Sequence, residues 1–304
     1  MDSARRHEAI HLVRALGLRG ALLLLAATLL ASSGSAQEPI ATPVTVEPAS
    51  PVQGTLFRVI VNAGSDVTGV TGTAAGEALH FERGSDGRYT ALAGAPLDGG
   101  GKLDLRVTLA RPSSSEPVQV TVPVASGSYA LDRLTVAPNF GTRPNAALQA
   151  RIDRERESAL GVSRRSHGTP RLWEIFARPR DTRITSGFGN GREFNGNIQS
   201  RHTGTDFAGA VGEPVFAAAR GLVALVDDFY LAGKVVYLDH GQGLVTAYFH
   251  LSETMVSSGD TVSAGQPIGK VGATGRVTGP HLHWVVRYGA ISLDPMSLLA
   301  IAGK

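Results

Sequence analysis

Alternation of apolar and polar residues limits how this chain can fold more than any other feature. It is clearest in residues 103–109, Leu-Asp-Leu-Arg-Val-Thr-Leu, and in residues 118–122, Val-Gln-Val-Thr-Val. Because successive side chains of a strand point to opposite faces, this alternation predicts strands with one buried face and one solvated face. Turn residues separate the strands, as in Asp-Gly-Gly-Gly at 98–101. The pattern over residues 43–125 therefore predicts an antiparallel β-sandwich domain of the immunoglobulin-like type.

A second β-rich region begins near residue 183 and continues to residue 299. Its apolar runs, at residues 221–226, 234–238 and 243–248, are short and show no long helical period and no internal repeat. This pattern predicts an antiparallel sheet. A chain of 304 residues is long enough for two domains. We therefore expect a mainly β protein with two domains.

The segment between the two β regions, residues 126–182, is predicted to be a linker with a short helix. Pro144 precedes residues 145–160, in which apolar residues recur at broadly helical spacing among charged ones. Residues 161–170 are polar and rich in turn formers. The linker either moves freely or lies across the groove of the second domain, and the sequence leaves both possibilities open.

The first 36 residues have the composition of a secretory signal. Four arginines lie before residue 20, an apolar run follows at residues 21–30, and small residues precede Gln37. The run is too short to span a bilayer comfortably, so we expect cleavage after Ala36 and no stable membrane insertion afterwards. An uncleaved N-terminal anchor is the alternative. The mature protein is then expected in the periplasm, the cell envelope or the extracellular space of a bacterium.

Charge and cysteine content exclude several classes of function. The formal net charge is +3, and residues 1–36 hold four arginines against Asp2 and Glu8, which leaves about +1 for the remainder. Binding to nucleic acid needs a basic face, so no nucleic-acid partner is expected. The absence of cysteine excludes disulfides, thiol catalysis and thiolate metal sites.

His281 and His283 are the first sign of chemistry in the sequence. On a strand they project from the same face, while Leu282 points into the opposite layer. His202 and Asp206, four residues apart, also share a face, whether that segment is extended or helical. Neutral imidazoles and an ionised carboxylate are suitable zinc ligands, and three protein ligands leave one coordination position for water. A His-x-His pair alone is nevertheless more often packing than a metal site.

The second β region resembles the lysostaphin/LytM-type zinc endopeptidases, which cut peptide bonds in bacterial peptidoglycan. The resemblance runs from about residue 183 to residue 295 and includes His-Thr-Gly-Thr-Asp at 202–206 and His-Leu-His at 281–283. It implies a barrel-sandwich-like antiparallel peptidase domain over residues 183–299, with peptidoglycan peptides as its substrate. The other matching blocks are residues 184–189, 212–218, 238–241, 248–252, 259–262 and 272–275.

The resemblance also assigns roles to five side chains. It implies one zinc ion per catalytic domain, with His202, Asp206 and His283 as its ligands. His250 and His281 are then the catalytic histidines, which do not bind the metal. All five positions are filled, unlike in relatives that have lost their ligands. The bond that is cut depends on the shape of loops, which the sequence does not give.

Two other functions are compatible with parts of the sequence. A zinc-binding but non-hydrolytic cell-wall regulator would activate a partner amidase, and its envelope partners would be unknown. A lipoyl or biotinyl carrier shares the hairpin of residues 262–269, but Lys270 lacks the exposed hairpin tip that a carrier lysine needs. Among the remaining histidines, we expect His80 and His240 to be structural and His167 to be solvated, each without a partner that the sequence reveals.

Overall fold

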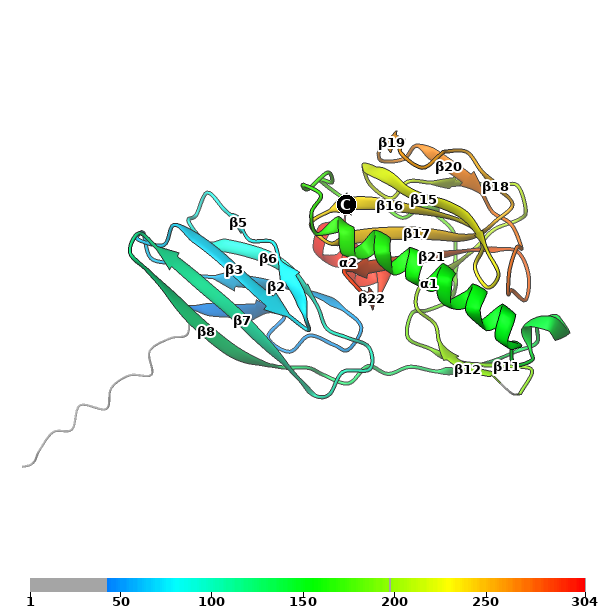
Figure 1. The fold of residues 1–304 in the computed structure, drawn as a ribbon, viewed down its shortest axis with the longest axis horizontal. Coiled ribbons are helices and arrows are strands. Elements are labelled where there is room, and N and C mark those ends of the chain that lie inside the picture. The colour runs from blue at the N-terminus through cyan, green and yellow to red at the C-terminus, as the bar shows by residue number, and fades with distance from the viewer. Residues whose placement is uncertain (1–42, 197, 304) are drawn as a thin grey trace, which may run out of the picture. The chain divides into compact units, whose positions relative to one another are not determined.

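The computed structural model describes residues 43–196 and 198–303. The predicted signal over residues 1–36 lies outside the described residues. Within the described part, no helix is long and apolar enough to cross a membrane. The fold is mainly β, as predicted, with one long helix between two groups of sheets (Figure 1).

Two antiparallel sheets of four strands each form the N-terminal region. The alternation predicted at residues 103–109 is confirmed, because β7 buries every second residue from Leu103 to Leu109. Both sheets contribute side chains to one apolar core. The first sheet has the order β1 (Val44–Glu47), β2 (Leu56–Val61), β6 (Tyr89–Gly94) and β5 (Glu82–Arg83). The second has the order β4 (Glu77–Leu79), β3 (Gly69–Ala74), β7 (Lys102–Arg111) and β8 (Ser114–Pro123).

An eight-stranded antiparallel sheet forms the base of the C-terminal region, as the sequence predicted. Its order is β10 (Ile184–Ser186), β13 (Thr205–Ala208), β21 (His281–Tyr288), β17 (Leu244–Leu251), β16 (Gly233–Gly241), β15 (Gly221–Phe229) and β19 (Thr261–Val262), and β22 (Ile291–Leu293) pairs with β21. A small sheet has the order β14 (Pro214–Phe216), β20 (Pro267–Lys270) and β18 (Glu253–Thr254). Helix α2 (Pro295–Ala302) follows the last strand.

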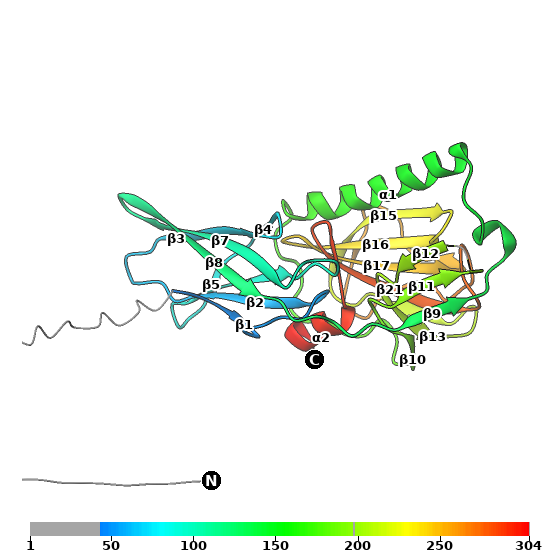
Figure 2. The ribbon, with the colours of Figure 1, turned by 90° about the horizontal axis from the view of Figure 1, so that it is seen from below.

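The helix predicted after Pro144 is present as α1 (Ala146–Ser166). Asn145 caps it, because its Oδ1 accepts a hydrogen bond from Leu148 N at 2.9 Å. The helix buries Val162 against β15, β16 and β17, and it lies along that sheet in both views (Figures 1 and 2). This packing explains why α1 continues beyond the predicted end at residue 160. The helix therefore covers one face of the eight-stranded sheet, the face that carries Val285 of β21.

A different part of the predicted linker joins a small sheet of the C-terminal region. Residues 131–134 form β9 (Leu131–Leu134), which pairs in parallel with β11 (Gly191–Phe194). Strand β11 also pairs with β12 (Ile198–Arg201), so the loop before the first predicted ligand is a hairpin. Figure 2 shows these three strands together, at the front of the C-terminal region. Between β9 and α1 lies the short helix η1 (Pro138–Phe140).

The N-terminal sheets and the eight-stranded sheet belong to one compact unit and share polar contacts. Tyr288 Oη, on β21, donates to Ala78 O at 2.7 Å. Ring nitrogens of His80 and His167 lie 2.9 Å apart, and His167 Nε2 lies 2.9 Å from Glu77 Oε2. The predictions that His167 is solvated and that His80 lacks a partner are wrong, because segments far apart in the chain close around both rings.

Candidate metal centre

The pairing of β13 with β21 places an aspartate beside a histidine. Their antiparallel register sets Asp206 opposite His283 and Ala208 opposite His281. Side chains directly opposite in a sheet share a face, with Cβ atoms about 5 Å apart. Leu282, between the two histidines, is fully buried, as the alternation predicted. The register of two strands therefore brings residues from distant parts of the chain to one face.

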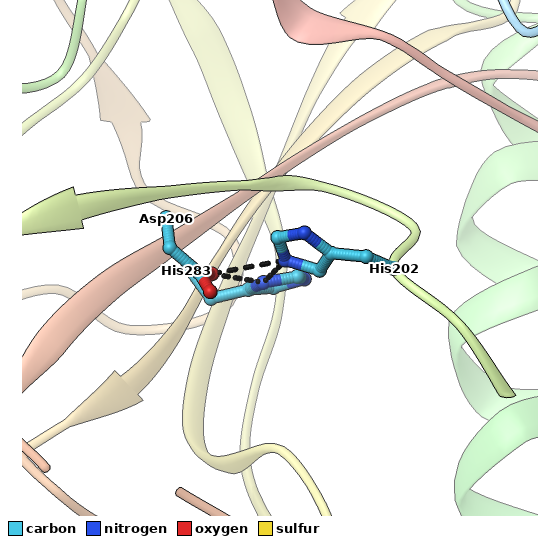
Figure 3. A group of neighbouring side chains, drawn as sticks. All are labelled: His202, Asp206 and His283. Atoms are coloured by element: carbon cyan, nitrogen blue, oxygen red, sulfur yellow. Dashed lines mark hydrogen bonds and ion pairs between the residues drawn. The ribbon is translucent and has the colours of Figure 1, made fainter. Parts of the chain in front are cut away.

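His202 completes the group from the loop between β12 and β13. Its Nε2 lies 3.0 Å from Asp206 Oδ1 and 2.9 Å from His283 Nδ1, and those two partner atoms are 2.7 Å apart (Figure 3). Gly204 permits this approach, since a Cβ there would lie 2.5 Å from Trp284 O and 2.7 Å from His283 Nε2. The three side chains are buried, and their possible ligand atoms all lie within 4.8 Å of one another.

The protonation states of this group suit a divalent cation. Burial alone would raise the pKa of Asp206, but the neighbouring rings of His202 and His283 hold that pKa well below its ordinary value. Burial lowers the pKa of His283 to about 4. His202 Nδ1 lies 2.6 Å from Gly187 O and donates to it, which leaves Nε2 with its lone pair. Two imidazole nitrogens and one carboxylate oxygen thus face one point, a donor set that fits zinc.

Arg192, on β11, holds the second oxygen of Asp206. Its Nη2 donates to Asp206 Oδ2 at 2.5 Å and to Ser186 Oγ at 3.3 Å. The two charged side chains are only 14% and 7% exposed. This contact orients the carboxylate so that Oδ1 faces the histidines. Sequence reasoning missed Arg192, because an arginine in a hairpin forms no pattern that distinguishes it from a surface residue.

The three candidate ligands, His202, Asp206 and His283, form the ligand group. The two predicted catalytic histidines lie beside it. The ring centroid of His250, at the end of β17, is 5.0 Å from that of His281. His250 Nδ1 lies 2.8 Å from Thr274 O, and His281 Nδ1 lies 2.8 Å from Gly279 O. Because a carbonyl only accepts, both rings carry their proton on Nδ1 and keep Nε2 as an acceptor. His281 Nε2 is buried and has no hydrogen-bond partner among the described residues.

The backbone of His250 is strained. Its φ of +62° lies in the left-handed region, which non-glycine residues seldom adopt. The conformation is held by the hydrogen bond from His250 N to Ala232 O, at 2.9 Å. Burial, followed by the charge of His281, places the pKa of His250 well below its ordinary value. Strain of this kind gathers at functional sites, where the surrounding structure maintains it.

Two hollows flank the group of ligands. The larger one, of about 630 Å³, reaches Asp206 and His281 and is bordered on one side by β9. The smaller one, of about 180 Å³, reaches His202, His250 and His283. The larger volume is typical of sites that bind small molecules or short peptides. The part of the predicted linker that borders the larger hollow is thus β9 rather than the predicted helix.

Two other residues considered in the sequence lie outside this group. His240 is buried, with Nδ1 2.8 Å from Arg220 O and Nε2 2.8 Å from Thr246 Oγ1, which matches the expected structural role. Lys270 ends β20 and pairs with Glu253 at 2.7 Å, so it does not sit at a hairpin tip. This setting argues against a carrier function.

Comparison with known proteins gives matches to this part of the chain. Residues 200–295 match the family described as Peptidase family M23. Peptidoglycan DD-endopeptidase ShyA of Vibrio cholerae serotype O1 is 48% identical over 83 residues, which are 27% of this chain and 19% of that protein. DD-carboxypeptidase/endopeptidase Mpg of Neisseria meningitidis serogroup B is 38% identical over 117 residues, which are 38% of this chain and 27% of that protein. The matches span less than a third of the length of these two relatives.

A solved structure extends the likeness beyond the matched segment. The crystal structure of a peptidase M23 from Pseudomonas aeruginosa is 28% identical, with a TM-score of 0.63, and the match covers 82% of this chain and 95% of that one. The shared fold therefore includes N-terminal strands as well as the catalytic sheet. Together with the ligand group built on β13 and β21, these matches assign residues 200–295 of the chain to peptidase family M23.

Proposed function

We propose that this protein is a zinc-dependent metalloendopeptidase that hydrolyses peptide cross-links or stem peptides of bacterial peptidoglycan. The observation that carries the proposal is the convergence of His202, Asp206 and His283 beside two further histidines whose Nε2 atoms are free to accept a proton. The relatives named as peptidoglycan DD-endopeptidases support this substrate and favour a bond between two D-amino acids.

Each residue around the ligand group has a separate role in hydrolysis. When bound, zinc supplies Lewis acidity at the point on which the three ligands converge. Arg192 orients the carboxylate of Asp206 toward that point. His250 Nε2 and His281 Nε2 are placed to take a proton from the attacking water and to return one to the leaving amine. The sequence His-Glu-Ala-Ile-His at residues 7–11 lies within the predicted signal. Among the described residues that line the two hollows there is no glutamate, so a histidine serves as the base.

We also propose an immunoglobulin-like sandwich over residues 43–125 and export to the periplasm or cell envelope. Two four-stranded antiparallel sheets around a common core support the first proposal. The basic and apolar segments within residues 1–36 support the second.

Digestion of purified peptidoglycan tests the proposed activity. Residues 37–304 are incubated with it alone, with a chelator, and with zinc restored after chelation, and released fragments are identified by mass spectrometry. We expect split cross-links that disappear with the chelator and return with zinc. The mass of each fragment identifies the bond. Zinc-loaded protein that binds peptidoglycan but releases nothing would contradict the proposal and favour the non-hydrolytic regulator.

A further inference from the structure

Arg276 lies where the two hollows meet. Its side chain, with Arg192 and Phe194, lines both the larger and the smaller hollow. The larger hollow reaches Asp206 and the smaller one reaches His202, so the ligand group borders both. An extended peptide with its scissile bond at the ligand group would therefore pass the side chain of Arg276.

The guanidinium of Arg276 is positioned by an aromatic ring rather than by an acid. Its Cζ lies 3.9 Å from the centroid of the Phe194 ring, and its backbone N donates to Leu231 O at 2.9 Å. Among the described residues, no carboxylate forms an ion pair with it. Burial, with the nearby charge of Arg192, lowers the pKa of Arg276 to about 10, so the side chain remains charged at neutral pH.

Arg192 differs from Arg276 because it already has a counter-ion. Its Nη2 donates to Asp206 at 2.5 Å, and that carboxylate is itself a candidate metal ligand. Among the described side chains that line the larger hollow, four carry a guanidinium (Arg133, Arg183, Arg192 and Arg276) and two carry a carboxylate (Asp132 and Asp206). A half-buried cation without a counter-ion is costly unless a ligand neutralises it. The excess positive charge beside the ligand group fits an anionic group on the substrate.

We propose that Arg276, supported by Phe194, binds a free carboxylate of the substrate peptide next to the scissile bond. This inference rests on the proposed endopeptidase function and adds a requirement on the substrate. A guanidinium offers two parallel N–H donors that match a carboxylate, and stacking on a ring fixes the plane of those donors. A peptide whose carboxylate is amidated leaves Arg276 without a counter-ion, so the subsite discriminates between the two forms.

Two synthetic peptides that contain a bond between two D-amino acids test the subsite. They differ in one group beside that bond, which is a free carboxylate in one peptide and a carboxamide in the other. The wild-type protein is expected to cleave the carboxylate peptide with a kcat/KM about ten- to a hundredfold higher, the range for one charge-assisted hydrogen-bonded contact. Arg276→Gln should close this gap by raising KM for the carboxylate peptide, at a normal zinc content. Equal kcat/KM for the two peptides in the wild type would overturn the proposal.

Two further variants separate the subsite from a general effect of charge. Arg133→Gln removes the same charge from the rim of the larger hollow, where the side chain is 75% exposed, and should keep the preference. Arg276→Lys keeps the charge but loses the planar donors, and it should show an intermediate preference. A kcat loss of the same size on both peptides in Arg276→Gln would assign Arg276 to the chemical step and overturn the carboxylate subsite.

Binding measurements distinguish failure of the subsite from failure of the proposed activity. The same two peptides are prepared with the scissile bond replaced by a CH₂–NH linkage, and their binding to the zinc-loaded protein is measured by calorimetry. The carboxylate form should bind the wild type more tightly than the amide form, and Arg276→Gln should bind both alike. Equal binding of both forms to the wild type would reject the subsite, whether or not peptidoglycan is cut.

Discussion

His250 and His281 each direct Nδ1 to a backbone carbonyl, and their ring centroids lie 5.0 Å apart. Each ring therefore keeps Nε2 as an acceptor, and His281 Nε2 lies 3.6 Å from Asp206 Oδ1. Because the three candidate ligands are other side chains, the proposed metal binding and the proposed proton transfer rest on different residues. Mutations should therefore separate the two properties.

His281→Ala is expected to keep zinc and to lose turnover. Removing a general acid or base lowers kcat by about 10²- to 10⁴-fold. Zinc content by atomic emission and kcat on a defined peptide check both parts. His80→Ala, which removes a histidine outside the ligand group, is the matched control and should keep both properties. Normal kcat in His281→Ala would exclude His281 from the chemistry.

Arg192→Gln is expected to weaken zinc binding without removing a ligand. The ion pair with Asp206 orients the carboxylate, and loss of such support lowers metal affinity by about 10- to 100-fold. Asp206→Asn removes the ligand charge itself and should have the larger effect. Competition with a chelator of known affinity measures both. If Arg192→Gln binds zinc as tightly as the wild type, the orientation of Asp206 does not depend on this contact.

His240 should make the protein less stable in acid. Burial lowers its pKa from an ordinary value of 6.5 to about 4. Since the folded state favours the neutral ring, the unfolded chain takes up the proton first. The stabilising contribution is therefore complete above pH 6.5 and declines as the pH falls from 6.5 toward about 4. A shift of this size corresponds to about 3 kcal/mol of the free energy of unfolding.

Urea unfolding of the metal-free protein at pH 7 and pH 4.5 measures this effect. His240→Asn cannot titrate in this range and should lose less stability between the two pH values than the wild type does. At pH 7 the variant should itself be less stable, because it loses the hydrogen bond to Thr246. An equal loss between pH 7 and pH 4.5 in both proteins would show that His240 does not titrate on unfolding.

His167→Ala is expected to destabilise the folded protein without affecting the metal group. The substitution removes the contacts of His167 with His80 and Glu77, which lie between the N-terminal sheets and α1. Loss of these half-buried partners should cost about 1–2 kcal/mol. Urea unfolding measures the change, and zinc content should stay normal. Arg164→Gln, at an exposed position of the same helix, should change stability by less than about 0.5 kcal/mol.

Features set by local spacing could be predicted from the sequence. The shared face of His281 and His283 follows from the period of a strand, and the start of α1 follows from Pro144 and the residues after it. The end of α1 could not be predicted in the same way. The helix continues because Val162 packs on the catalytic sheet, and a tertiary contact of this kind leaves no local signal.

Contacts between distant residues were beyond the reach of sequence patterns. His80 and His167 are 87 positions apart, and no spacing rule relates them. Phe194 ends β11 and Arg276 lies in the loop before β21, yet the guanidinium of Arg276 stacks on the Phe194 ring where both line the larger hollow. Such residues acquire a role only through the fold. Sequence reasoning therefore identified the five histidine and aspartate positions but not the arginines around them.

Strand β9 has a consequence for how this protein can be divided. Residues 131–134 and their partner β11 lie outside residues 200–295, the segment that matches the family, yet both border the larger hollow. A fragment cut to the matched segment would carry the candidate metal ligands but lack β9 and β11, which line one side of the larger hollow. Exchange of that segment alone would therefore transfer the candidate metal ligands and Arg276 without Phe194 and β9, which complete the lining of the larger hollow.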